Sequence, residues 1–164
     1  MIQKILNYFK IKSFHTYWNS YGGFKAIWAS PYFKISLLLS LILNFFGSYE
    51  KWFDLPLSIL PNLLGFSIGA YAVVLVLGNG DFWKFIAEYS EDNLFMNINS
   101  SFVHFIFVQV IAIIFALFSK GLLLDNWIAS FFGILFLIYA ILTAFAASMA
   151  ILELSKHYQK FLRK

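Results

Sequence analysis

Two strongly apolar stretches of the chain contain four polar side chains that could do chemistry inside a membrane: His104, Gln109, Tyr139 and Thr143. A histidine changes its charge near physiological pH, so His104 is the residue that could respond to a proton. Polar groups at membrane depth are rare and often mark ion or substrate pathways. If the two stretches pair antiparallel, His104 lies level with Thr143 and Gln109 level with Tyr139. We therefore expect these four groups mainly to hydrogen-bond between helices.

Three stripes of small or polar residues follow helical spacing in the apolar stretches. They are Ser36, Ser40 and Asn44; then Asn62, Gly65 and Gly69 with Ser58, Ala72 and Val76; and finally Ala129, Gly133, Ala140, Ala144 and Ala147. Small side chains let helix backbones approach closely. An antiparallel pairing of the first two stretches would place Asn44 level with Asn62, so we predict that the first two stripes pack against each other. The third stripe suits helix packing or a contact between subunits.

No catalytic motif accompanies these residues. The 164 residues contain no cysteine and no HExxH, GxSxG or P-loop sequence. No acidic residue lies within an apolar stretch, and the nearest is Glu153, at the end of the last one. Because ion-coupled transporters usually need a carboxylate inside the membrane, this pattern disfavours small multidrug exporters. We predict a protein that is not an enzyme and that has no cofactor and no metal site.

The elements that position these residues follow from the composition. Hydrophobic residues make up 61% of the chain, charged residues only 12%, and the mean hydropathy is +0.76. A soluble domain of this size cannot bury so much apolar surface, whereas a membrane-spanning helix uses about 20 apolar residues. Four stretches meet that requirement, at residues 32–48, 57–78, 102–118 and 127–152. The predicted fold class is therefore all-α, an integral membrane four-helix bundle made of two antiparallel transmembrane hairpins.

The basic residues predict the orientation of these spans. If both termini are cytoplasmic, only Lys51 and Lys120 of the 12 lysines and arginines lie outside. We expect three parts: an interfacial amphipathic segment at 1–30, the transmembrane domain at 31–155 and a basic cytoplasmic tail at 156–164. The pI of about 9.2 then reflects topology, and no nucleic-acid partner is expected. Richness in Ile, Phe, Lys and Asn is typical of an AT-rich bacterial genome, which indicates the bacterial inner membrane.

Several runs of the sequence are similar to small four-span bacterial inner-membrane proteins. These runs are LPNLLGFSIGAYAVVLVLG with the GDFW segment that follows it, FVHFIFVQ, and YAILTAFAASMAILEL. Proteins of this kind include membrane components of bacterial anti-phage defence systems. The resemblance implies a four-span fold and an association with such defence, and it carries over no functional residue.

Two functions from different classes fit this sequence. The first is a non-enzymatic membrane subunit, an anchor or sensor, that forms a homo-oligomer in the lipid bilayer and works with a cytosolic protein partner. The alternative is a small oligomeric ion channel or pore that depolarises the membrane, in which Asn44, Asn62, Gln109 and His104 line a pathway between subunits. An enzyme that acts on lipid has no motif in its favour.

Overall fold

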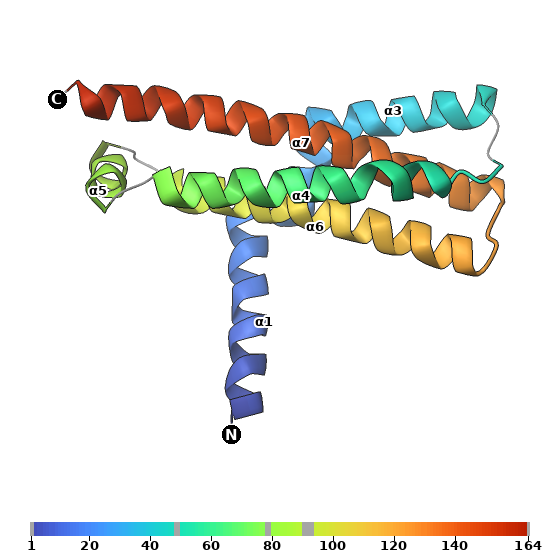
Figure 1. The fold of residues 1–164 in the computed structure, drawn as a ribbon, viewed down its shortest axis with the longest axis horizontal. Coiled ribbons are helices and arrows are strands. Elements are labelled where there is room, and N and C mark those ends of the chain that lie inside the picture. The colour runs from blue at the N-terminus through green and yellow to red at the C-terminus, as the bar shows by residue number, and fades with distance from the viewer. Residues whose placement is uncertain (1, 48–49, 78–79, 90–93, 164) are drawn as a thin grey trace.

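All regular structure in the described part of the chain is helical, which confirms the predicted all-α class (Figure 1). The computed structural model describes residues 2–47, 50–77, 80–89 and 94–163. The helices in these residues are α1 (Ile2–Tyr21), α2 (Gly23–Ala29), α3 (Pro31–Phe46), α4 (Asp54–Leu77), α5 (Gly80–Tyr89), α6 (Leu94–Gly121) and α7 (Trp127–Leu162).

Three helices are long and apolar enough to cross a membrane: Asp54–Val76, Phe95–Gly121 and Trp127–Leu162. The helix in the first predicted span, α3, has only 16 residues. It is therefore about 24 Å long, shorter than a hydrocarbon layer of about 30 Å. A fourth span exists only if Lys12–Ala29 and Pro31–Phe46, which meet at 41°, form one bent span. The described residues thus contain three or four candidate spans.

Two of the helices extend well beyond the stretches expected from hydropathy. The helix predicted around 102–118 begins at Leu94, and the one predicted around 127–152 continues to Leu162, because backbone hydrogen bonding does not stop where the side chains become polar. With 36 residues, α7 is about 54 Å long, which is more than the thickness of a bilayer. Its C-terminal end lies beside α5, where Phe82 packs on Phe161 with ring centroids 5.6 Å apart (Figure 1).

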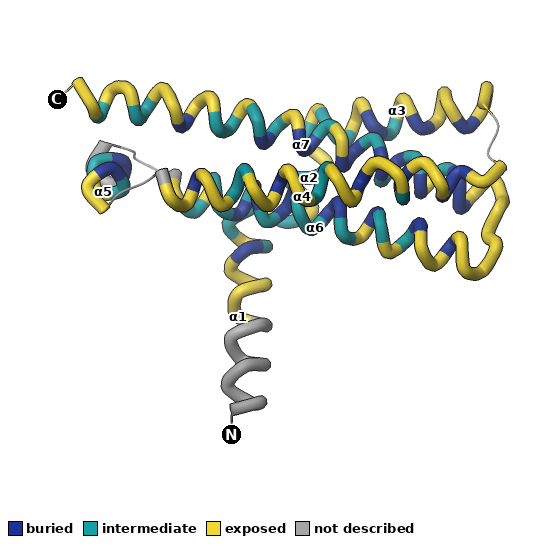
Figure 2. Tube along the Cα trace, viewed as in Figure 1, coloured by how far each residue is buried: buried dark blue, intermediate teal, exposed yellow. Residues whose placement is uncertain are grey.

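The N-terminal helix α1 leaves the bundle at a steep angle and is exposed along most of its described side chains (Figures 1 and 2). It ends at Gly22 and Gly23, whose φ angles of +94° and +60° lie in the region that favours glycine. Its C-terminal part packs on α6, and Tyr17 there is buried. A helix across the bundle axis would lie along a membrane that the bundle spans, which suits the interfacial segment predicted at 1–30.

The helices pair differently from the predicted hairpins. α7 lies at the centre, with α3 along one side and α6 along another, and α4 packs on α6 and more lightly on α7. The backbones of α3 and α4, which are consecutive in the sequence, do not pack against each other. The predicted contact between the stripes of spans 32–48 and 57–78 is therefore wrong. The stripe of α3 is buried on α7 instead.

The end of the bundle away from α5 is closed by polar contacts between two connections. Both carboxylate oxygens of Asp125 accept the backbone N–H of Lys51, at 3.0 and 3.1 Å. Trp52 donates its ring N–H to the carbonyl oxygen of Leu124 at 3.1 Å. The Trp52 ring lies directly on Gly133 of α7, which leaves no room for a side chain there. These contacts hold the start of α4 beside the start of α7.

Candidate functional site

The buried centre of the molecule holds a cluster of one histidine and three tyrosines, drawn from α1, α6 and α7. Nδ1 of His104 is hydrogen-bonded to the hydroxyl of Tyr17 at 2.9 Å, and Nε2 to the hydroxyl of Tyr139 at 2.9 Å. The ring of Tyr21 stacks on the imidazole with centroids 3.8 Å apart. His104, Tyr17 and Tyr139 are all buried. The cluster therefore ties the N-terminal helix to the two longest helices of the bundle.

The hydrogen bonds of this cluster connect α1, α6 and α7. A neutral imidazole has one donor and one acceptor nitrogen, and a phenol hydroxyl can serve as either, so both ring nitrogens of His104 are satisfied. Within the described residues, the partners of His104 are two phenols, and no carboxylate is among them. The arrangement contains no activated nucleophile beside a base, which is the geometry that covalent catalysis needs.

The predicted partner of His104 was Thr143, and that pairing is wrong. The Thr143 hydroxyl is buried but donates to the carbonyl oxygen of Ala140, 3.0 Å away on its own helix. Tyr139 lies one helical turn earlier on α7 and takes the place expected of Thr143. Thr143 and Tyr139 are one turn apart on α7, so both lie near the level of His104. The larger phenol of Tyr139 spans the gap between α7 and α6.

Gln109 was predicted to pair with Tyr139, and this is also wrong. Its Nε2 donates instead to the hydroxyl of Ser67 on α4 at 2.8 Å. Both residues are buried, and Oε1 of Gln109 has no partner in the structure. An unpaired buried acceptor costs about 1–3 kcal/mol, so this contact joins α4 to α6 without satisfying the whole amide.

The stripe on α3 is a packing face, as predicted, but its partner is α7. Ser36, Ser40 and Asn44 are all buried. The two serine hydroxyls donate to carbonyl oxygens of their own helix, at 2.7 and 2.9 Å. Asn44 donates from Nδ2 to the carbonyl oxygen of Trp127 at 3.1 Å, and not to Asn62. This bond fixes the register of α3 on the first turn of α7.

The stripe on α4 is left exposed along its whole length (Figure 2). Its members are Ser58, Asn62, Gly65, Gly69, Ala72 and Val76. A Cβ atom added to Gly65 or Gly69 would meet nothing within 4 Å. The packing role predicted for Asn62, Gly65 and Gly69 is therefore not fulfilled inside the chain.

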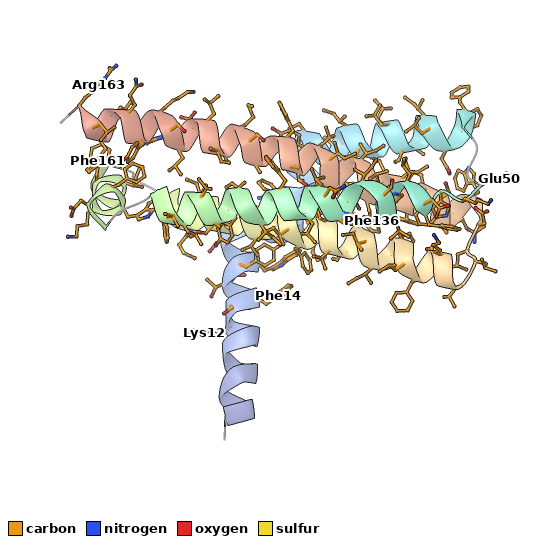
Figure 3. The ribbon with its side chains drawn as sticks, in the orientation of Figure 1. Lys12, Phe14, Glu50, Phe136, Phe161 and Arg163 are labelled. Atoms are coloured by element: carbon orange, nitrogen blue, oxygen red, sulfur yellow. The ribbon has the colours of Figure 1, made fainter. Side chains whose placement is uncertain are left out.

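A cavity of about 740 Å³ lies beside the histidine cluster, between α1, α2, α3, α6 and α7. Its walls are mostly aromatic, and Phe14 of α1 meets Phe107 of α6 there with ring centroids 6.0 Å apart (Figure 3). His104 and Tyr139 contribute to the wall, but their polar atoms are engaged in the hydrogen bonds of the cluster. The space suits an apolar group.

The structure brings together some of the sequence-predicted residues and separates others. His104 and Tyr139 meet, whereas Gln109, Asn44 and Asn62 lie at three other places on the molecule. Sequence reasoning missed Tyr17 and Tyr21, although their i, i+4 spacing puts them on one face of α1. It also missed Ser67, one of the few polar residues in the second apolar stretch.

Comparisons with protein-family models, with curated proteins and with solved structures find no match to this chain.

Proposed function

We propose that this chain is a non-enzymatic membrane subunit that self-associates through the exposed stripe of α4 and works with a cytosolic partner. The observation that carries the proposal is that stripe, which contains Gly65 and Gly69 and is exposed among the described residues. The small stripe of α3 is buried on α7, and that of α7 is buried against Trp52 and against residues of α4 and α6. The stripe of α4 is the one that remains available among the described helices.

The spacing of the α4 stripe favours a left-handed pair of helices. Its residues recur at intervals of four and three, the heptad pattern that gives crossings of about 20°. Two copies inserted with the same orientation would be related by a two-fold axis along the membrane normal. Gly65 and Gly69 would then allow the backbones to come close at the centre of the contact.

Asn62 supports the same arrangement. Its amide lies on the outside of an apolar helix, and no hydrogen bond within the described residues engages it. A polar amide that faces hydrocarbon is unfavourable. Across a two-fold axis the two Asn62 side chains would lie close enough to pair, a contact worth about 0.6–2 kcal/mol.

Single-cysteine cross-linking tests this interface directly, because the natural chain has no cysteine. We expect Asn62→Cys and Gly69→Cys to form disulfide-linked dimers in membranes on mild oxidation. The control is Ile68→Cys, which is 50% exposed on α4 but lies about 100° around the helix from Gly69. Gly65→Leu should abolish the dimer. Equal cross-linking at position 68 and at the stripe positions would refute the proposed interface.

The cytosolic end of the proposed subunit is built from α5 and the last turns of α7. Phe82 and Ile86 of α5 are buried against Tyr158 and Phe161, so this end is a packed surface that a partner could dock on. The resemblance to membrane components of anti-phage systems extends the proposal to bacterial defence. Protection against phage that requires both this chain and a neighbouring gene would support it, and protection by neither would count against it.

The alternative function, a pore, remains a prediction. His104, Gln109 and Asn44 are buried at three different contacts within one chain, so a shared pathway would need a rearrangement of the helices. Bilayer recordings on the purified protein would distinguish the two functions. Conductance that disappears in Gly65→Leu would favour a pore at the interface between copies.

A further inference from the structure

The cavity of about 740 Å³ beside the histidine cluster, which we call the aromatic cavity, has a wall of contacting rings. Trp18 of α1 meets Phe24 of α2 with ring centroids 4.8 Å apart, and Phe14 stacks on Trp18 at 6.3 Å. In the same wall, Trp28 of α2 meets Phe33 of α3 at 5.2 Å. These contacts join α1, α2 and α3 into one apolar side of a cavity whose other side is formed by α6 and α7.

The turn between α1 and α2 fixes one of these rings. The Trp18 ring lies against Gly23, where an added Cβ atom would be 3.1 Å from Nε1 of the indole. Gly23 also has a φ angle of +60°, a conformation that favours glycine. Because the backbone of the turn places Trp18 in the wall, the shape of the aromatic cavity is set by the fold.

The described residues of this wall all belong to segments that could cross a membrane. Those of α6 and α7 lie inside the candidate spans Phe95–Gly121 and Trp127–Leu162. Those of α1, α2 and α3 lie inside the bent pair Lys12–Ala29 and Pro31–Phe46. In an inserted chain the aromatic cavity therefore lies at the depth of the hydrocarbon layer, where the molecules around the protein are the acyl chains of lipids.

The aromatic cavity is open to the surroundings of the protein. Phe14, Phe24 and Trp28 line it and are also exposed on the surface. Its volume falls within the range of about 300–1,000 Å³ that sites for small molecules have. Aromatic and aliphatic wall atoms gain dispersion contacts with the methylene groups of a chain that fills the space. A flexible hydrocarbon chain therefore matches both the walls and the entrance.

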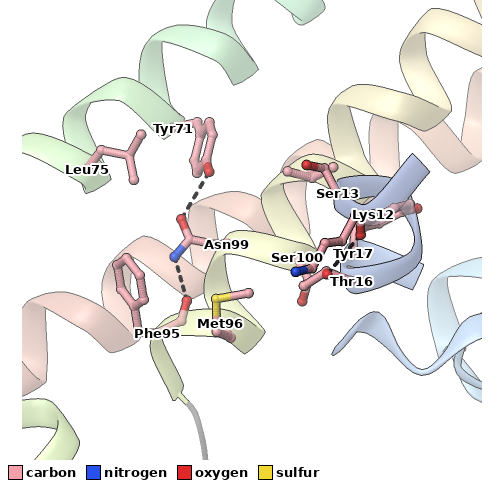
Figure 4. Close-up of a pocket in the computed structure, with 11 residues that line it drawn as sticks. Lys12, Ser13, Thr16, Tyr17, Tyr71, Leu75, Phe95, Met96, Asn99 and Ser100 are labelled. Carbon is pink, nitrogen blue, oxygen red and sulfur yellow. Dashed lines mark hydrogen bonds between the residues drawn. The ribbon is translucent and has the colours of Figure 1, made fainter. Parts of the chain in front are cut away.

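A second cavity, of about 570 Å³, lies between α1, α4 and α6 and has a different chemistry (Figure 4). In its wall, Asn99 accepts from the Tyr71 hydroxyl at 3.0 Å and donates to the carbonyl oxygen of Phe95 at 2.7 Å. Lys12 and Ser100 add a charge and a hydroxyl group. Covering polar and charged groups with hydrocarbon is unfavourable, so an acyl chain prefers the aromatic cavity.

We propose that the aromatic cavity binds one acyl chain of a membrane phospholipid, with the headgroup outside the cavity. The selectivity is for the chain, because the rings of the wall offer contact surface to methylene groups. A bound chain touches α1 and α2 on one side and α6 on the other, so it helps to hold the N-terminal helix on the bundle. This inference rests on the membrane insertion in the proposed function, but not on self-association.

The test is photo-cross-linking of the purified full-length protein in detergent micelles. The probe is a phosphatidylcholine with a diazirine in the middle of one acyl chain, and the labelled residues are identified by mass spectrometry. We expect labelling of the wall residues Phe107 and Ile111 to saturate near one probe molecule per chain. Labelling of Phe45 and Phe46, which are exposed on α3 and do not line the cavity, should rise in proportion to the probe.

Variants that fill a cavity test the location of the bound chain. Ile111→Trp enlarges a side chain of the aromatic wall and should abolish the saturable labelling of Phe107. The matched control is Ile114→Trp, on the same helix and also exposed, but not in the wall. Leu75→Trp, in the wall of the second cavity, should likewise leave the labelling of Phe107 unchanged.

Several outcomes would overturn the proposal. Labelling of Phe107 in the natural protein that never saturates would do so without any variant, as would equal losses in Ile111→Trp and Ile114→Trp. Displacement of the probe by a prenyl quinone but not by unlabelled phosphatidylcholine would assign the cavity to a different ligand. The dimer-breaking variant Gly65→Leu should still be labelled at Phe107, which separates this inference from self-association. Membrane insertion is read separately, because an inserted chain stays with membranes in alkaline carbonate.

Discussion

Replacing Gly133 by alanine would place a methyl group inside the ring of Trp52. A Cβ atom on Gly133 would lie 1.8 Å from Cζ3 of that ring and 2.4 Å from Cη2, whereas carbon atoms prefer about 3.5–4.0 Å. The ring is only 6% exposed, and its N–H donates to the carbonyl oxygen of Leu124. It therefore cannot move aside without loss of contacts that close the end of the bundle.

The expected cost follows from three effects. Overpacking of a buried site costs about 1–3 kcal/mol, and loss of the bond from Trp52 to Leu124 adds about 0.5–1.5 kcal/mol. The better helix propensity of alanine offsets about 1 kcal/mol of this. We expect Gly133→Ala to lower the free energy of unfolding by about 2 kcal/mol.

The assay is reversible unfolding in mixed micelles, followed by tryptophan fluorescence and helical circular dichroism. The control is Gly121→Ala on α6, where an added Cβ would meet nothing within 4 Å. Its helix propensity should leave stability equal or up to about 1 kcal/mol higher. In a protein that also carries Trp52→Ala, Gly133→Ala should change the free energy of unfolding much less, because the overlapping ring is gone. If the Gly133→Ala protein is as stable as the Gly121→Ala protein, the Trp52 ring does not pack on Gly133 as described.

Two further predictions concern hydrogen bonds, one in the histidine cluster and one at the end of the bundle away from α5. Tyr139→Phe leaves Nε2 of His104 buried without its partner and should lower the free energy of unfolding by about 1–3 kcal/mol. The control is Tyr32→Phe, which removes a hydroxyl that has no hydrogen bond within the described residues and should change the free energy of unfolding little. Asp125→Ala removes the acceptor of the Lys51 backbone N–H, so the exchange of that amide hydrogen with solvent should become faster; unchanged protection would show that the carboxylate does not hold the turn.

The sequence by itself determined the helical class and the buried face of α3. Hydropathy places the apolar stretches, because a helix satisfies its own backbone in lipid wherever side chains are apolar. Helical spacing identified the face of α3 that holds Ser36, Ser40 and Asn44, and all three are buried. The Gly22–Gly23 pair likewise ends the first helix, since both residues have positive φ.

The ends of the helices could not be predicted as well. The stretch expected at 102–118 lies inside a helix that begins at Leu94, and the first span is shorter than the bilayer. Hydropathy reports where side chains are apolar, whereas a helix continues as long as its backbone bonds and packing support it. The contact of α5 with the last turns of α7 stabilises residues that hydropathy assigns to a tail.

Only the tertiary structure decided which helices are neighbours. Matching depths allowed Asn44 to meet Asn62 and His104 to meet Thr143, because depth constrains position along the membrane normal and leaves the direction around each helix free. The stripe of α3 packs on α7 and not on α4, with Asn44 bound to the carbonyl oxygen of Trp127. That choice leaves the stripe of α4 exposed, and it is the reason for expecting a second copy of the chain there.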